Sequence, residues 1–329
     1  MNLKRMFLIF SARNKEFYRD KGALGWVFLF PFLMVIGFGY MFDMSDTGAV
    51  KAGVVSSEKI DVDMVEEIYF TTEEKALEKL RIHKVDIVIS GKSYFVNTDS
   101  PKSLLGEKLY LQSISVPPSD VVRKEVVGGK VNYIDWLFPG LLTFNGLWMA
   151  LWGVGWVIVR QRKLGVLKRL KASPVTAAEY LLAQILSRMV VLVLSALAVY
   201  VGASFLHPFK MVGSYFDFFF VYALGSFSMS AVGLIVAARL SSEELANGIL
   251  NLLTYPMMFF SEIWFSLEGS SEVIKGIAKV MPLWHMTDSM RKIMTEGARL
   301  SDLMPSMIFL TVIGVVCTFL GAKMFRWIS

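Results

Sequence analysis

The amino-acid sequence predicts an α-helical integral membrane protein with six transmembrane helices and a small α/β domain inserted between the first two helices. Three observations lead to this fold class. First, 54% of the 329 residues are hydrophobic, and a mean hydropathy of +0.52 would force a water-soluble domain to expose large apolar patches. Second, several apolar runs reach the roughly 20 residues that cross a hydrocarbon core. Third, residues 43–135 lack such a run and hold 12 basic and 16 acidic residues.

Residues 1–21 open the chain with an amphipathic pattern. Apolar residues recur at helical spacing among six lysines and arginines, which is typical of a helix lying on the cytoplasmic membrane surface; a soluble surface helix is the alternative. The first span, residues 22–42, contains Pro31, which membrane helices tolerate because neighbouring groups satisfy the freed carbonyl. No small-residue cleavage site follows it, so we expect this span to be retained.

The insertion at residues 43–135 is expected to fold as an α/β domain. A Thr-Thr-Glu-Glu sequence at 71–74 has the pattern of a capping box and predicts a helix through Arg81. Gly91-Lys92-Ser93 imitates the end of a phosphate-binding loop, but Asp86 occupies the position of the required glycine, so we exclude nucleotide binding there. The expected strands are Val50–Val55, Val85–Ile89 and Tyr94–Val96.

Five further apolar runs complete the predicted spans: residues 136–159, 178–204, 215–238, 245–265 and 303–325. Six spans place both termini on one side of the membrane. Lysine and arginine are concentrated in the N-terminal segment and in residues 160–177, whereas the loop before residue 215 has one lysine and residues 266–302 balance five basic with five acidic residues. Because positive loops face the cytoplasm, we expect both termini there and the α/β domain outside.

Several kinds of chemistry are excluded by the residue pattern. The net charge of +6 does not indicate nucleic acid, because the basic residues lie beside apolar spans, where topology and membrane lipid explain them. Cys317 is the only cysteine, and the three histidines, including His285, are scattered, so we expect no catalytic residue, metal site or cofactor on this chain. Arg188 falls inside the third span and is interpreted as an anchor that reaches the cytoplasmic interface, with gating as the alternative.

Residues 160–177 form the most informative segment. Leu164, Leu167 and Leu170 recur at intervals of three among six basic residues, and Pro174 follows. This pattern predicts a short amphipathic helix that either lies on the membrane or seats its leucines in a groove of a cytoplasmic partner. The pattern alone leaves both possibilities open.

The order of motifs resembles the ABC-2 family of ABC-transporter permeases over nearly the whole chain. The segment is similar to the family's coupling helix, in which Gly-x-Leu, Arg-Leu and Ser-Pro-Val recur after the second span. The insertion resembles the extracytoplasmic domain of the multidrug-type branch. Two residues depart from the family pattern: Gln161 replaces a usual glutamate, and Glu262 a frequent glycine. The other matching motifs are Leu137-Phe138-Pro139-Gly140, Tyr255-Pro256, and Met281-Pro282-Leu283-Trp284-His285 in a re-entrant outer hairpin at 266–302.

The resemblance implies the membrane subunit of a type V, ABC-2 exporter in a bacterial inner membrane. Two such subunits, identical or related, would pair and join two copies of an ABC ATPase that binds ATP and Mg, because this chain has no complete phosphate-binding loop. The implied cargo is a hydrophobic or amphipathic compound such as a drug, antibiotic or lipid. The residues implied to contact the ATPase are Arg162, Leu164, Gly165, Leu167, Lys168, Arg169, Leu170 and Pro174.

Polar residues in two spans are candidates for the translocation pathway. Asn247, Asn251 and Thr254 share one helix face that Glu262 continues, and Asn145 and Trp148 form a similar stripe in the second span. The resemblance implies that these spans approach the dimer axis; helix packing is the alternative. Glu262 could bind a cationic substrate or pair with Arg291 or Lys292.

Two other functions are alternatives to ATP-driven export. An ABC-type signalling or mechanotransmission complex would use the α/β domain as a sensor. An ion-driven secondary transporter is disfavoured, because the deep parts of the spans hold amides, hydroxyls and aromatic rings instead of an ionisable relay.

Overall fold

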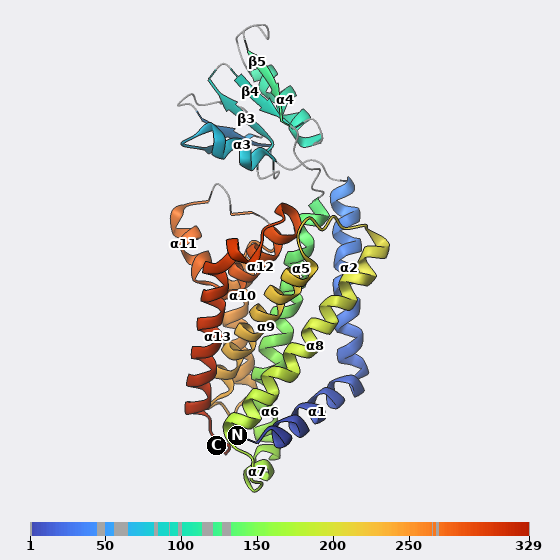
Figure 1. The fold of residues 1–329 in the computed structure, drawn as a ribbon, viewed down its shortest axis with the longest axis vertical. Helices are drawn as coiled ribbons and strands as arrows, with labels where there is room; N and C mark the ends of the chain where they lie inside the picture. Colours follow the sequence, from blue (N-terminus) through green and yellow to red (C-terminus); the bar gives the residue numbers. More distant parts are fainter. Residues whose placement is uncertain are drawn as a thin grey trace. The chain divides into compact units, whose positions relative to one another are not determined.

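The computed structural model describes residues 2–44, 50–55, 65–81, 85–91, 93–97, 101–113, 121–126, 133–264, 266–267 and 270–328. The chain divides into two compact units (Figure 1). The helical unit comprises Met1–Gly37, Leu137–Phe265 and Val273–Ser329. The α/β unit comprises Phe38–Trp136 and Ser266–Glu272.

The α/β unit contains a five-stranded sheet in the order β2-β1-β3-β4-β5. Only β3 and β4 pair antiparallel, through a turn at Gly91 with φ +57°, and the other pairs are parallel. The strands are β1 (Val50–Val54), β2 (Val65–Tyr69), β3 (Ile87–Ser90), β4 (Ser93–Val96) and β5 (Val122–Glu125).

Helices α3 (Glu73–Arg81) and α4 (Pro101–Ser113) cover opposite faces of this sheet. Ile87 and Ile89 of β3 lie in one buried cluster with Tyr110 of α4. Val88, between them, lies in another cluster with Leu80 of α3. Because alternate residues of a strand point to opposite faces, the sheet is buried on both sides.

The structure has more strands than the sequence predicts. Strands β1, β3 and β4 and helix α3 overlap the expected elements, whereas β2, α4 and β5 were not expected. Strand β5 has the sequence Val-Arg-Lys-Glu and is exposed at all four positions, so it shows no apolar alternation. It forms because β4 offers it a pairing edge.

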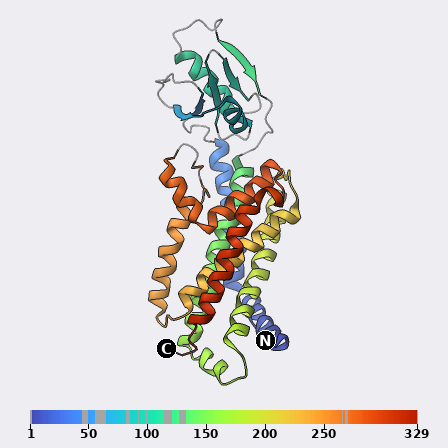
Figure 2. The same cartoon turned by 60° about the vertical axis from the view of Figure 1, so that its left-hand side comes forward.

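The helical unit is built from these helices: α1 (Leu3–Arg19), α2 (Lys21–Met44), α5 (Tyr133–Leu151), the π-helix η2 (Trp152–Trp156), α6 (Val157–Lys163), α7 (Val166–Lys171), α8 (Ala177–Leu206), α9 (Tyr215–Ala237), α10 (Glu243–Phe260), α11 (Glu272–Val280), α12 (Pro282–Arg291), the π-helix η3 (Lys292–Glu296), the 3-10 helix η4 (Leu300–Leu303) and α13 (Met304–Met324). Helix α1 lies beside α8 in both views (Figures 1 and 2).

The described residues contain four helical stretches that are long and apolar enough to cross a membrane: Ile134–Lys163, Ala177–Leu206, Tyr215–Ala237 and Leu300–Met324. The number rises to five if α1 and Leu24–Gly37, bent by 63° at their junction, count as one span. Helix α10, which overlaps the predicted span 245–265, is not among them because its 18 residues include two glutamates and two asparagines. The six-span count therefore stays a prediction.

Helix α9 contacts α8, α12, α13 and the π-helix η2. Two glycines allow this close packing. A Cβ atom on Gly225 would lie 2.4 Å from the sulfur of Met286, and one on Gly233 would lie 3.0 Å from the carbonyl oxygen of Leu151. Small residues serve the same purpose in membrane helix pairs generally.

The predicted re-entrant hairpin contains α11 and α12. Pro282 begins α12, where a proline costs no hydrogen bond. His285 of α12 donates from Nε2 to the carbonyl of Lys279 (2.8 Å) and accepts at Nδ1 from Ser306 (3.0 Å). Burial lowers the pKa of His285, so the ring is neutral at pH 7. The neutral tautomer therefore joins the α11–α12 turn to α13.

Candidate functional site

The predicted coupling segment forms a turn between two short helices. Helix α6 ends at Lys163, and α7 begins at Val166. Between them Gly165 adopts φ +71° and donates its backbone N–H to the carbonyl of Arg162 (3.1 Å). This left-handed conformation favours glycine. We refer to residues 160–175 as the α6–α7 segment; it has two helices where the sequence predicts one.

Arg162 is buried, with 6% of its surface exposed. Its guanidinium donates to four backbone carbonyls: those of Ala237 (2.8 Å), Ala238 (3.2 Å), Leu240 and Arg326 (3.0 Å). The first three lie at the end of α9, where carbonyls lack partners within the helix, and a cation at this end is favourable. Arg162, which we expected to contact the ATPase, is thus engaged by this chain and caps α9.

The three leucines of the α6–α7 segment have different environments. Leu167 is completely buried in a cluster with Ile158 and Tyr180, and Leu170 packs partly against that cluster. Leu164 is 62% exposed. Of the three, Leu164 is the most exposed, and a carboxylate at position 167 would be buried in the core.

Basic residues share the exposed surface of the segment with Leu164. Lys168 and Arg169 of α7 are exposed, as is Pro174 beyond it. The Nζ atom of Lys163 lies 3.3 Å from a carboxylate oxygen of Glu243 at the start of α10. Exposed ion pairs of this kind contribute little, about 0–1 kcal/mol, so the segment keeps a positive surface around one apolar side chain.

Helix α1 is fastened to the other end of the segment. Thr176 and Glu179 form a capping box at the start of α8, with hydrogen bonds of 3.0 and 3.3 Å. Glu179 also accepts the backbone N–H of Asn2, and Arg5 donates to the carbonyl of Pro174. The sequence pattern of α1 predicts its amphipathic character but not this attachment.

Arg188 lies against the π-helix η2. Its Nη2 atom donates to the carbonyl of Gly153 (3.1 Å), and its guanidinium stands 5.6 Å from the ring of Phe17. A Cβ atom on residue 153 would lie 2.0 Å from Nε of Arg188. The glycine therefore makes room for the guanidinium, and π-helices of this kind occur frequently at functional sites. Sequence reasoning missed this pair because its members are 35 residues apart.

The two predicted polar stripes meet at a tryptophan. Trp148 stacks on Trp152 with ring centroids 4.3 Å apart, and Trp152 donates from Nε1 to the side-chain oxygen of Asn247 (3.1 Å). Asn145 donates to the carbonyl of Val27 on α2 (3.1 Å). Asn145 therefore connects α5 with α2, and Trp148 of α5 is connected through Trp152 to Asn247 of α10.

The remaining pathway candidates do not form one continuous stripe. Thr254 is buried and donates its hydroxyl to the carbonyl of Leu250 in its own helix (2.8 Å). Asn251 is half-buried. Glu262 follows the end of α10, with φ +52°, and no longer shares the helix face. The stripe is interrupted because α10 ends at Phe260.

Glu262 pairs with Arg291, one of the two alternatives that the sequence left open. Nη2 of Arg291 donates to the carbonyl of Glu262 (2.6 Å), and Nη1 lies 3.6 Å from its carboxylate. Only 4% of the Arg291 side chain and 12% of the Glu262 side chain are exposed. The pair ties the end of α10 to α12.

This pairing predicts a measurable coupling. In a double-mutant cycle of Glu262→Gln and Arg291→Gln, followed by thermal unfolding of the purified chain, we expect a coupling energy of about 1–3 kcal/mol, because both groups are largely withdrawn from solvent. Additive effects of the two substitutions would mean that the carboxylate is hydrated and free to meet a cationic substrate.

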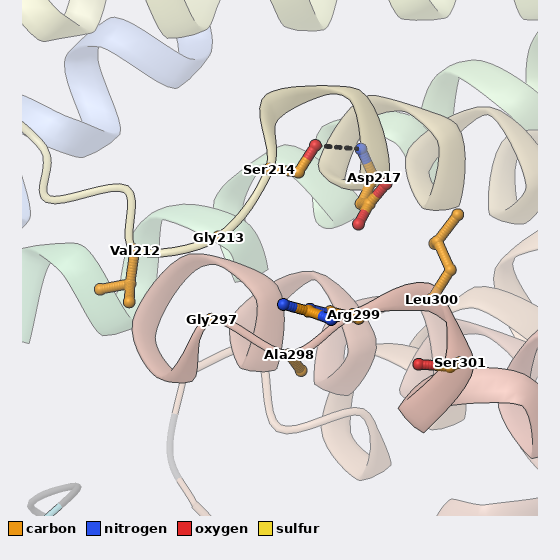
Figure 3. Close-up of a pocket in the computed structure, with 9 residues that line it drawn as sticks. All are labelled: Val212, Gly213, Ser214, Asp217, Gly297, Ala298, Arg299, Leu300 and Ser301. Carbon is orange, nitrogen blue, oxygen red and sulfur yellow. Dashed lines mark hydrogen bonds between the residues drawn. The ribbon is translucent and has the colours of Figure 1, made fainter.

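A pocket of about 550 Å³ lies near the start of α9 (Figure 3). The loop before α9 lines one side, held by the backbone N–H of Val212, which donates to the carbonyl of Met294 (2.9 Å). Asp217 and Arg299 bring one acidic and one basic group to the wall. None of the residues predicted from the sequence lines this pocket. Among the residues that the structure describes, no group of three or more His, Cys, Asp or Glu side chains could hold a metal ion.

Comparison with known proteins gives two consistent results. Residues 21–323 match the family described as ABC-2 family transporter protein. The inner membrane transport permease YhhJ of Escherichia coli K12 is 24% identical over 180 residues, which are 54% of this chain and 48% of the relative, and the YhhJ of Shigella flexneri gives the same values. The chain thus spans about half the length of the curated relatives it matches.

Proposed function

Because this chain belongs to the ABC-2 family of transporter proteins, we propose that it is the permease subunit of an ATP-driven exporter. It moves a hydrophobic or amphipathic compound out across the cytoplasmic membrane. Hydrolysis of ATP takes place on a separate ABC ATPase, present in two copies, and a second permease, identical or related, completes the complex. The observation that supports this proposal is the exposed surface of the α6–α7 segment, where Leu164 stands among basic residues.

The segment is suited to receive force from a partner. Leu164 and the basic residues around it form a small exposed surface. Arg162 fastens the segment to the end of α9 and to the C-terminal tail, and Arg5 fastens α1 to Pro174. A displacement of this surface by the ATPase would reach α9 and α8 through direct contacts.

The proposed topology follows the distribution of positive charge. Both termini and the α6–α7 segment face the cytoplasm, the α/β unit and the α11–α12 hairpin face outward, and α2 and α10 complete six spans. Thr254 and Glu262 are engaged within the chain. Asn145 and Asn247 also have partners within the chain, but they lie with Trp148 and Asn251 on the two helices α5 and α10, and these four residues are the ones we propose for the translocation pathway.

The substitution Leu164→Asp tests the coupling surface. With the chain purified from native membranes together with its ATPase and reconstituted in liposomes, we expect transport-coupled ATP hydrolysis to fall at least tenfold. The physical reason is that a carboxylate would stand where an apolar contact forms. Membrane insertion and melting temperature should not change, because Leu164 is 62% exposed.

The matched control is Arg239→Asp, which adds negative charge at an exposed position beside Ala238, at the same end of the helical unit. It should leave coupling within about twofold of the parent. Full ATPase coupling in Leu164→Asp, or an equal loss in Arg239→Asp, would remove the assignment of this surface.

The folded α/β unit also fits a signalling complex in which it senses an external signal. Such a complex would show ATPase coupling through Leu164 but no movement of solute across the liposome membrane. An ion-driven transporter would instead move solute without ATP. Transport measured with and without ATP separates the three functions.

A further inference from the structure

A second pocket, of about 370 Å³, lies in the helical unit where α1, α2, the π-helix η2 and α8 meet. Its volume falls within the roughly 300–1,000 Å³ range of pockets that hold small molecules. Arg188 of α8, Phe17 of α1 and Trp152 of η2 are among its lining residues. None of the proposed ATPase contacts lines it.

Arg188 supplies an anion-binding group that this chain leaves only partly engaged. A guanidinium within a membrane span is costly unless a partner compensates it. Among the described residues it donates one hydrogen bond, to the carbonyl of Gly153 (3.1 Å), and forms no ion pair with a carboxylate. Arg188 lines the pocket, and Gly153 provides the space in which its guanidinium lies.

The charges around the pocket favour an anion. Arg13 pairs with Glu16 and donates to the side-chain oxygen of Gln184 (2.8 Å), so these groups largely compensate one another. Arg160, also a lining residue, lies 5.0 Å from the ring of Trp156. Three arginines and two carboxylates line the pocket, the second carboxylate being that of Asp20, which leaves one positive charge.

The rest of the lining is apolar and aromatic. Tryptophans at the boundary between membrane and water commonly contact the upper part of lipid chains. Three tryptophans, Trp26, Trp152 and Trp156, line the pocket, and 65% of the surface of Trp26 is exposed. The other apolar lining residues are Phe17, Val27, Met149, Val157 and Val191.

We infer that this pocket binds the head of a singly charged anionic membrane amphiphile, a phosphodiester lipid from the leaflet beside α1. The guanidinium of Arg188 receives the phosphate through paired N–H donors, and the tryptophans contact the beginning of the acyl chains. The site is built from this chain alone, so it stands or falls independently of the ATPase coupling proposed above.

The test is lipid binding by the full chain, purified in a neutral detergent and titrated with phosphatidylglycerol or phosphatidylcholine of equal chain length. Bound lipid is counted by native mass spectrometry. We expect one phosphatidylglycerol to bind at least tenfold more tightly than phosphatidylcholine, and Arg188→Gln to abolish that preference. The control Arg19→Gln removes an exposed charge of α1 outside the lining and should keep it. A preference that survives in Arg188→Gln overturns the inference.

A second variant guards against misfolding of Arg188→Gln. Gln184→Glu keeps the side-chain shape and its contact with Arg13 but adds a negative charge to the pocket, so it should also abolish the preference; its melting temperature is measured to show that the variant is folded. An intact preference in this folded variant overturns the inference. Water-soluble glycerophosphoglycerol, which carries the same singly charged phosphodiester, should bind at least a hundredfold more weakly than phosphatidylglycerol; equal binding would show a site for free anions and overturn the assignment to an amphiphile.

Discussion

Replacing Arg162 by alanine is expected to lower the melting temperature of the purified chain far more than the same replacement of the neighbouring Arg160. The change removes the guanidinium donors of four carbonyls, three of them at the end of α9, although the carbonyl of Ala238 still accepts the backbone N–H of Arg326 (3.0 Å). It also leaves a cavity beneath the ring of Phe325. A buried acceptor without a partner costs about 1–3 kcal/mol. We therefore expect a total loss of about 3–5 kcal/mol, measured by thermal unfolding in detergent.

The neighbouring Arg160 gives the matched control. It is exposed and its guanidinium contacts the ring of Trp156, so Arg160→Ala should cost about 1 kcal/mol or less. Arg162→Lys should fall between the two, because an ammonium group keeps the charge but cannot reach four carbonyls with a planar fork. Equal melting temperatures for Arg162→Ala and Arg160→Ala would contradict the capping role.

The burial of Arg162 could not be predicted from the sequence of the α6–α7 segment. The leucine spacing predicts one helix with the three leucines on a shared face, whereas α6 ends at Lys163 and α7 begins at Val166, so Leu164 lies between the two helices. The spacing does not tell whether a leucine meets the chain's own core, as Leu167 does, or stays open, as Leu164 does. The carbonyl of Ala237 is 75 residues from Arg162, and only the tertiary fold brings the two together.

The α/β unit shows the same division between local and tertiary signals. Strands β1 and β3 are rich in valine and isoleucine and could be predicted from composition. Strand β5 could not, because its residues are polar and exposed and its conformation depends on pairing with β4. The charge balance of residues 43–135 nevertheless suffices to predict a folded insertion.

The interior of the helical unit contains side-chain contacts that no sequence motif predicts. A glycine in an apolar run fits any close helix contact, and only the position of Arg188 shows that Gly153 accommodates a guanidinium. Likewise, the spacing of Asn247, Asn251 and Thr254 predicts a shared face, but the sequence cannot show that Trp152 binds the first and the helix backbone the last. These contacts determine which polar groups remain for a substrate.

The second large effect is expected for Gly165→Pro, which should reduce transport-coupled ATP hydrolysis at least tenfold in the reconstituted complex. Proline fixes φ near −65°, whereas residue 165 has φ +71°, and it removes the N–H that bonds to the carbonyl of Arg162. The axis of α7 would change direction, and Leu167 would no longer pack in the buried cluster with Ile158 and Tyr180. The predicted cost is about 3 kcal/mol, confined to the segment, so the chain should still insert into the membrane.

Gly165→Ala separates conformation from bulk. A Cβ atom at this position meets no atom within 4 Å, so alanine adds only the strain of a left-handed residue, about 1–2 kcal/mol, and should retain most of the coupling. A complex with Gly165→Pro that couples as well as Gly165→Ala would show that the direction of α7 is unimportant. In that case force from the ATPase would have to enter through another cytoplasmic surface, and the contacts of Arg162 would serve stability alone.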